Sequence, residues 1–143
     1  MTRKAVLLIL ITTPILLSAQ QVVISPVTEK TVIGFQYGAS VSMEVQSQWR
    51  FGGFYQTSLS RQEQIMSHDQ FWGMTVSAPL MKADRITFYG NARIGIVNKY
   101  FMILCPAVVT ELKIFRRLYV DVGMSVRKGY LSAQTSLIIK HKT

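Results

Sequence analysis

The sequence predicts an all-β fold, an antiparallel up-and-down β-barrel (a meander) of eight strands. Apolar and polar residues alternate with a period of two in segment after segment, which is the pattern of β-strands with unlike faces. Short connections separate these segments, and one longer polar loop, residues 61–69, stands apart. No helical period of useful length follows residue 20, and 143 residues suffice for one domain with one core.

The chain begins with a segment typical of a secretory signal peptide. A basic start precedes the apolar run AVLLILITTPILLSA (5–19), which ends in a small residue. The run is shorter than the roughly 20 apolar residues of a transmembrane helix, although an uncleaved anchor is the alternative. We therefore expect residues 1–19 to be a signal peptide and residues 20–143 to form the barrel domain.

The N-terminal half contains four predicted strands. Residues 21–27 form a short apolar run, which we count as a strand because it gives an even strand number and places both termini at one end. Residues 31–41, 48–59 and 70–80 each alternate aromatic and aliphatic side chains with Gly, Gln, Ser and Thr. The polar loop 61–69 then lies at the end opposite the termini, as in outer-membrane barrels with short turns on the terminal side.

Three further strands in the C-terminal half show the same alternation. They are residues 85–97, 118–127 and 130–140. In RITFYGNARIGIV (85–97), isoleucine, phenylalanine and alanine side chains form one face, and the other face carries threonine, tyrosine, asparagine and arginine. The pattern therefore predicts one buried or lipid-facing side and one polar side for each strand.

The segment 100–112 is apolar on both faces around Pro106. Proline cannot donate a hydrogen bond to a sheet ladder, so it belongs at an edge or a bulge. We expect a β-bulge at Pro106, which exchanges the two faces beyond it. Glu111 then joins the polar face, whereas Ile103 and Cys105 lie on the apolar face.

Three features favour lipid outside the barrel. The strands run about ten to thirteen residues, and a tilted bilayer-crossing strand needs about 9–11. The polar face is rich in glycine, which suits a narrow, side-chain-filled interior. Aromatic residues gather near strand ends, as in the interface girdles of membrane barrels. We expect Trp49, Phe51 and Phe88 at one rim of the apolar band, and Trp72 and Phe101 at the other.

The charged strand residues predict a polar network inside the barrel. An arginine turned toward the bilayer midplane costs about 2–4 kcal/mol, so charged residues within strands should point inward. Buried charges need partners. The predicted interior network consists of Arg50, Arg93, Glu111, Asp121 and Arg127, with Asp121 or Glu111 neutralising Arg93.

Composition excludes several function classes. The 16 Lys and Arg against 7 Asp and Glu give a formal charge of +9, but the basic residues are scattered, so no nucleic acid partner is expected. Two histidines and one cysteine make a typical zinc site improbable, and no cofactor is expected. His68 and Asp69 are adjacent and so would point to opposite faces of a strand, which predicts no catalytic pair.

Several stretches resemble small outer-membrane β-barrel proteins of Bacteroidota-type bacteria. They are LLSAQQ at the end of the signal segment, GFQYGASV, FYGNARIGI and VRKGYLSAQTSLIIKH. The resemblance covers most of residues 20–141 and implies a Gram-negative outer-membrane location, insertion by the barrel-assembly machinery and often no assigned activity. Such barrels commonly end in an aromatic residue, whereas this chain ends in IIKHKT.

These observations predict an outer-membrane barrel with a structural or interaction role and no catalysis, whose partner is membrane lipid and whose protein partner is unknown. One alternative is a soluble periplasmic, lipocalin-like barrel that binds a small apolar ligand. A second is a lipid-modifying outer-membrane barrel enzyme, which would use serine and histidine near the rim of the long loop.

Overall fold

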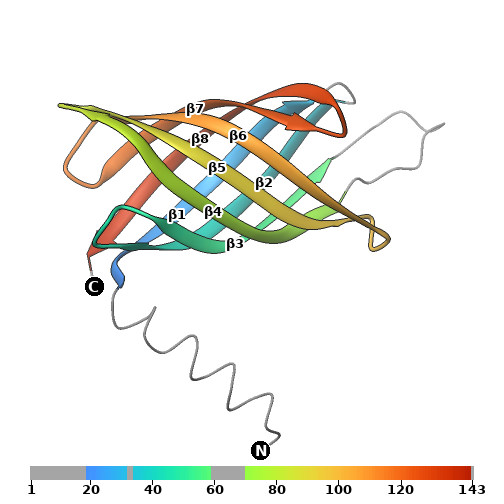
Figure 1. The fold of residues 1–143 in the computed structure, drawn as a ribbon, viewed down its shortest axis with the longest axis horizontal. Helices are drawn as coiled ribbons and strands as arrows, with labels where there is room; N and C mark the ends of the chain where they lie inside the picture. Colours follow the sequence, from blue (N-terminus) through green and yellow to red (C-terminus); the bar gives the residue numbers. More distant parts are fainter. Residues whose placement is uncertain (1–18, 32–33, 59–69, 143) are drawn as a thin grey trace, which may run out of the picture.

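The computed structural model describes residues 19–31, 34–58 and 70–142, which form a closed eight-strand β-barrel (Figure 1). Every strand pairs antiparallel with its neighbours in chain order, and β1 pairs with β8 to close the barrel. The predicted all-β meander is confirmed. The strands are β1 (Ala19–Thr31), β2 (Gly34–Val45), β3 (Arg50–Ser58), β4 (Gln70–Ala83), β5 (Ile86–Val97), β6 (Phe101–Lys113), β7 (Leu118–Arg127) and β8 (Tyr130–Lys142).

The first strand is longer than the apolar run that predicted it. The sequence pattern indicated residues 21–27, whereas β1 continues to Thr31 and pairs with β2 as far as Gly34. The additional residues include Glu29, which is completely buried inside the barrel. An isolated charged residue at the end of an apolar run does not end a strand when a partner inside the barrel neutralises it.

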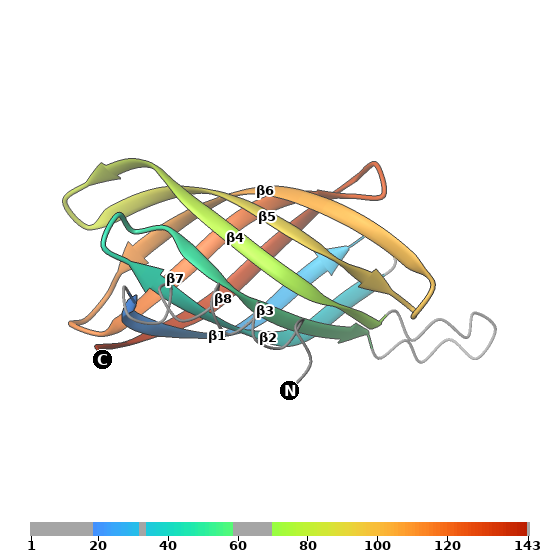
Figure 2. The ribbon, with the colours of Figure 1, turned by 60° about the horizontal axis from the view of Figure 1, so that its bottom comes forward.

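The two ends of the barrel differ in their connections. β1 begins and β8 ends at one end, which we call the terminal end (Figure 2). The hairpins that follow β2, β4 and β6 lie there, and those that follow β5 and β7 lie at the opposite end, the loop end. The predicted long loop, 61–69, falls outside the described residues. No helix in the described part of the chain is long and apolar enough to cross a membrane.

The predicted bulge at Pro106 is wrong. β5 and β6 pair residue by residue along nearly the whole of β6. Pro106 faces outward, and β6 pairs with β7 only from Ala107 onward, so the proline lies where the ladder to β7 ends. A residue without an N–H disturbs strand pairing least at such a place. The register instead shifts in β4 between Pro79 and Met81, close to the terminal end.

The first half of β6 therefore turns the opposite face inward from the one expected. Cys105, which the sequence pattern placed on the outer apolar face, is completely buried inside. It packs with Phe54, Phe71 and Val97, and Ile103 packs against the same cluster. Glu111 does point inward, but by simple alternation from Cys105 and not through a bulge. Because β6 is apolar on both faces, alternation could not reveal which face is inside.

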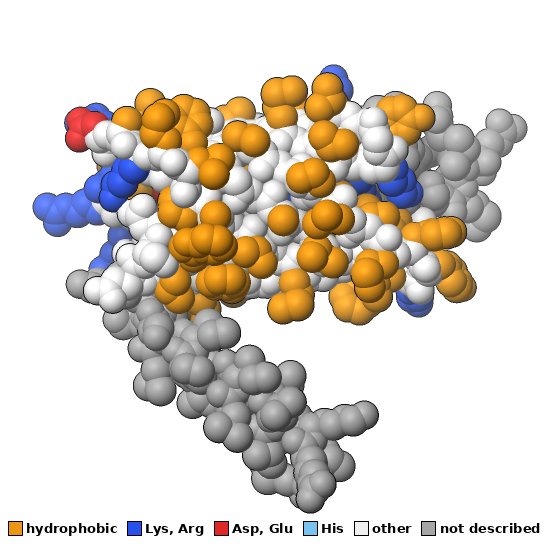
Figure 3. All heavy atoms as spheres, in the orientation of Figure 1, with side chains coloured by type: hydrophobic (Ala, Val, Ile, Leu, Met, Phe, Trp, Pro, Cys, Tyr) orange, Lys and Arg blue, Asp and Glu red, His pale blue; other side chains and the backbone are white. Residues whose placement is uncertain are grey.

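Apolar side chains are spread along the length of the barrel face shown in Figure 3, and large exposed hydrophobic residues occur on all eight strands. Large exposed side chains inside the strands, each at least three residues from either strand end, include Val41, Met74, Ile94, Leu104 and Val122. This distribution reverses that of a water-soluble protein, which seldom exposes a contiguous apolar surface of such extent.

Two paired glycines allow β4 and β5 to approach closely. Gly73 lies opposite Gly95 in the ladder. A Cβ atom added to Gly73 would lie 2.1 Å from the Ile94 carbonyl oxygen, and one added to Gly95 would lie 2.3 Å from that of Trp72. Both distances are far below van der Waals contact, so the local strand curvature requires glycine at these positions.

Candidate functional site

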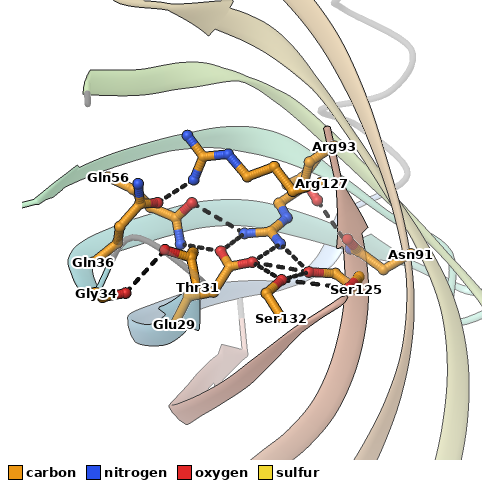
Figure 4. Close-up of polar contacts among 11 residues, drawn as sticks. Glu29, Thr31, Gly34, Gln36, Gln56, Asn91, Arg93, Ser125, Arg127 and Ser132 are labelled. Carbon is orange, nitrogen blue, oxygen red and sulfur yellow. Dashed lines mark hydrogen bonds and ion pairs between the residues drawn. The ribbon is translucent and has the colours of Figure 1, made fainter. Parts of the chain in front are cut away.

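One buried carboxylate organises the polar interior of the loop-end half (Figure 4). Glu29 of β1 accepts hydrogen bonds from Arg93 Nη1 at 2.9 Å and Nη2 at 3.2 Å. It also accepts from the hydroxyls of Ser125 at 2.8 Å and Ser132 at 2.5 Å, and from Gln56 Nε2 at 3.1 Å. We call these five residues the loop-end cluster. They come from β1, β3, β5, β7 and β8, so the cluster ties opposite walls of the barrel together.

Aromatic rings lie against the guanidinium groups of Arg93 and Arg127. Phe54 and Phe71 meet edge to face, with ring centroids 4.6 Å apart. The Arg127 guanidinium lies 4.5 Å from the centroid of Phe71, and that of Arg93 lies 5.9 Å from the centroid of Phe54. Arg127 also donates to the side-chain oxygen of Gln36. Cation–π contacts therefore supplement the single carboxylate in this half.

The terminal-end half holds a ring of alternating charges. Arg50 contacts Glu44 at 2.8 Å and Glu111 at 2.5 Å. Lys140 contacts the same two carboxylates, at 3.1 Å and 2.9 Å respectively. All four side chains are at least nine-tenths buried. We call these four residues the terminal-end ring; Arg50 additionally donates to the hydroxyl of Tyr89 at 3.0 Å.

A small cavity of about 70 Å³, with both polar and apolar residues in its lining, lies between the two clusters. Serine and threonine hydroxyls line much of it, and Asp121 faces it. Among the described residues, Oδ1 of Asp121 and Oδ1 of Asn91 are buried without a hydrogen-bond partner. A cavity of this size and polarity accommodates water, which can hydrogen-bond to such groups.

All five residues of the predicted interior network are buried inside the barrel: Arg50, Arg93, Glu111, Asp121 and Arg127. Their pairing differs from the expectation. The prediction that Asp121 or Glu111 neutralises Arg93 is wrong, because both belong to the terminal-end half, and Arg93 instead pairs with Glu29.

Sequence reasoning missed three charged members of the network: Glu29, Glu44 and Lys140. Lys140 continues the inward alternation of Ser132, Gln134 and Ser136, so strict counting along β8 would have found it. The two glutamates lie beyond the predicted ends of β1 and β2, in residues that the pattern left out of the strands.

The five predicted interface aromatics lie on the outer face near the strand ends. Trp49 and Phe51 are exposed at the terminal end and stack with ring centroids 6.1 Å apart. Trp72 and Phe101 are exposed at the loop end, and Phe88, near the terminal end of β5, is half-buried.

The described residues contain no group of three or more His, Cys, Asp and Glu side chains placed to hold a metal ion. His68 and Asp69 lie outside the described residues. His141 is exposed beside the terminal end. The best-defined arrangement of functional groups in the described barrel is therefore the pair of ionic clusters in its interior.

No protein-family model matches the sequence, and no curated protein matches it. Three solved structures have a similar fold. A de novo designed transmembrane β-barrel has a TM-score of 0.72 at 8% identity, covering 86% of this chain and 97% of that one. The solution structure of the designed barrel TMB2.3 has a TM-score of 0.69 at 8% identity, with 87% and 96% covered. The N-terminal β-barrel domain of Pseudomonas aeruginosa OprF has a TM-score of 0.67 at 9% identity, with 86% and 98% covered.

At such low identity the likeness concerns the fold alone. This chain folds like small eight-strand membrane barrels, both designed and natural.

Proposed function

We propose that this protein crosses the outer membrane of a Gram-negative bacterium with all eight strands and serves as a structural or interaction component without catalytic activity. The observation that carries the proposal is the reversed distribution of side chains: charged groups are paired inside the barrel, and large apolar groups cover the outside. Lipid is the solvent that makes such a surface favourable.

Strand length supports a membrane-spanning barrel. The strands contain 9 to 14 residues, and a tilted strand needs about 9–11 to cross a bilayer. The exposed tryptophans Trp49 and Trp72 lie at opposite ends of the barrel, where they would mark the two membrane–water interfaces.

The interior does not suit a small apolar ligand. Its central cavity is about 70 Å³, which is much smaller than the pockets that hold small ligands, and charged side chains such as Arg50, Arg93 and Asp121 share its lining with apolar ones. The two ionic clusters lie on either side of this cavity and connect opposite walls of the barrel. A structural role therefore fits the interior better than a lipocalin-like carrier or an open pore.

Export and assembly form part of the same proposal. The basic and apolar segment 1–19 would direct the chain through the inner membrane and be removed. The barrel-assembly machinery would then insert residues 20–143. The Bacteroidota-type origin rests on the sequence resemblance.

Fractionation tests the location directly. Expressed with its own N-terminal segment in a Gram-negative host, the protein should pellet with the outer membrane and require detergent for extraction. The folded barrel should migrate differently on gels when it is left unheated. Recovery in the supernatant after membranes are pelleted without detergent would refute the proposal.

A matched pair of arginine substitutions tests what surrounds the barrel. Ile94→Arg places a charge within the outer apolar band, three residues from the end of β5, and should cost up to about 2–4 kcal/mol in lipid. Tyr130→Arg places the same charge at the exposed loop-end rim, where the cost falls to about 0–1 kcal/mol. Insertion into lipid vesicles should fail or slow for the first variant only. Equal behaviour of the two variants would indicate water outside.

A further inference from the structure

The net positive charge of the protein is not in the barrel interior. Residues 20–143 contain 14 basic and 7 acidic residues. Four of each are buried in the interior, where they balance: Arg50, Arg93, Arg127 and Lys140 with Glu29, Glu44, Glu111 and Asp121. The remaining ten basic and three acidic residues therefore account for the whole excess of positive charge in residues 20–143.

Half of these ten basic residues lie on two neighbouring hairpins of the terminal end. Lys82 and Arg85 belong to the β4–β5 hairpin, and Lys113, Arg116 and Arg117 to the β6–β7 hairpin. All five are exposed, and the Lys113 amide donates to the Arg85 carbonyl at 2.9 Å, which joins the hairpins. We call residues 80–85 and 113–117 the basic arc.

The basic arc contains one acidic residue, Asp84. In Figure 3 basic side chains project from the end of the barrel to which these hairpins belong. Asp84 offsets one of the five positive charges of the arc and leaves four unbalanced, so an anionic surface is the complementary partner.

Exposed apolar side chains stand beside these charges. Leu80 and Met81, at the register shift in β4, are 63% and 58% exposed. Ile114 and Phe115, in the β6–β7 hairpin, are 51% and 68% exposed. A turn that presents isoleucine and phenylalanine directly before two arginines has the composition of a segment that lies in a membrane interface.

We propose that the basic arc binds the anionic headgroups of phospholipids in the leaflet at the terminal end. The inference rests on the membrane-spanning function proposed above. Lysine and arginine side chains of the arc contact lipid phosphates, and Ile114 and Phe115 enter the acyl region beneath them. An acidic polysaccharide would meet the charges but would leave the four apolar side chains in water, so it fits the surface less well.

A fluorescence experiment can measure which lipid surrounds the arc. Trp49→Phe and Trp72→Phe remove the two native tryptophans, and Phe115→Trp then places a single tryptophan in the arc. The protein is folded into phosphatidylcholine vesicles with a minor fraction of phosphatidylglycerol, and bromine is carried by one lipid or the other. Bromine quenches nearby tryptophan, so the two quenching values give the local share of each lipid.

Anionic lipid should be enriched around the arc by about twofold or more over its share in the vesicle, and high salt should remove this enrichment. The triple variant Lys113→Gln, Arg116→Gln and Arg117→Gln, made in the reporter protein, should lower the local share to that of the vesicle.

Two controls separate the arc from the rest of the barrel. Lys30→Gln, Lys99→Gln and Lys128→Gln neutralise three exposed lysines of the loop-end half and should leave the enrichment at position 115 intact. A protein with Trp72 as its only tryptophan reports from the loop end and should be quenched in proportion to the vesicle composition.

The outcomes distinguish the two proposals. If the protein does not insert into either kind of vesicle, as judged by its mobility on unheated gels, the proposal that it spans a membrane is refuted. If it inserts but both lipids quench position 115 at their vesicle shares, the headgroup proposal alone is overturned. An acidic protein would then be the partner to seek for the arc.

Discussion

The two ionic clusters inside the barrel balance their charges differently. In the loop-end cluster Glu29 is the single carboxylate, while Arg93 and Arg127 both lie in that half. In the terminal-end ring two carboxylates alternate with two cations, and Asp121 lies beside them. By formal charge, one half of the interior therefore carries an excess positive charge and the other an excess negative charge, although the formal total is zero.

This difference predicts different tolerance to substitution. Each member of the terminal-end ring contacts two groups of opposite charge, so the loss of one member leaves every other member with an ion pair. In the loop-end cluster the ion pair is that of Arg93 with Glu29. The ion pairs of the terminal-end ring are therefore redundant, whereas the loop-end cluster depends on Glu29.

The largest effect is expected for Glu29→Gln. The substitution keeps the shape of the side chain but leaves the buried Arg93 without its carboxylate, which should lower the free energy of unfolding by about 3–5 kcal/mol. Urea unfolding of the protein folded in lipid vesicles, followed by gel mobility, measures the loss. A loss similar to that of Ser132→Ala, about 1 kcal/mol, would contradict the central role of Glu29.

The double variant Glu29→Leu with Arg93→Leu should recover much of that loss. Apolar replacement of both partners of a buried ion pair is often neutral, whereas removal of one partner leaves an uncompensated charge. The double variant should be more stable than either single variant by about 2 kcal/mol, as a double-mutant cycle would show. Simple addition of the two single losses would mean that the pair is not energetically coupled.

A smaller effect is expected for Glu44→Gln, the same chemical change in the terminal-end ring. Arg50 and Lys140 both retain Glu111, so the loss should be about 1–2 kcal/mol. The same unfolding measurement applies. If Glu44→Gln and Glu29→Gln destabilise equally, the ring is not redundant.

The smallest effect, and of opposite sign, is expected for Asp121→Asn. Asp121 lies directly across the β6–β7 ladder from Glu111, and its Oδ1 has no hydrogen-bond partner within the described barrel. Like charges directly opposite one another destabilise a sheet by about 0.2–1 kcal/mol, so removing one should raise the unfolding midpoint slightly. A lowered midpoint would show that the charge of Asp121 stabilises the terminal-end half.

The fold was predictable because a two-residue period is a local property of the chain. The inward direction of Arg93 and the outward direction of Ile94 follow from alternation whatever the rest of the molecule does. The inward face of β6 was not predicted, because the residues on both sides of Pro106 are apolar and alternation of polarity therefore carries no information there. Its true inner face became visible only through the register with β5.

The pairing inside the barrel was not predictable in the same way. Alternation places Arg93, Glu111 and Asp121 inside, but it does not give their heights along the barrel axis. Those heights depend on strand tilt and stagger, which are set by closure of the whole sheet. Glu29 was missed for a related reason: the end of β1 is fixed by its pairing with β2 and β8, not by the apolar run that begins it.

The packing of Cys105 makes its thiol a built-in probe of barrel opening. It is the only cysteine of the chain, and it lies with no exposed surface between Phe54, Phe71 and Val97. A thiol reagent can reach its sulfur only when the wall or the loop-end cluster opens. The rate of thiol labelling in the unmodified protein therefore reports the opening of the barrel directly, without an engineered probe.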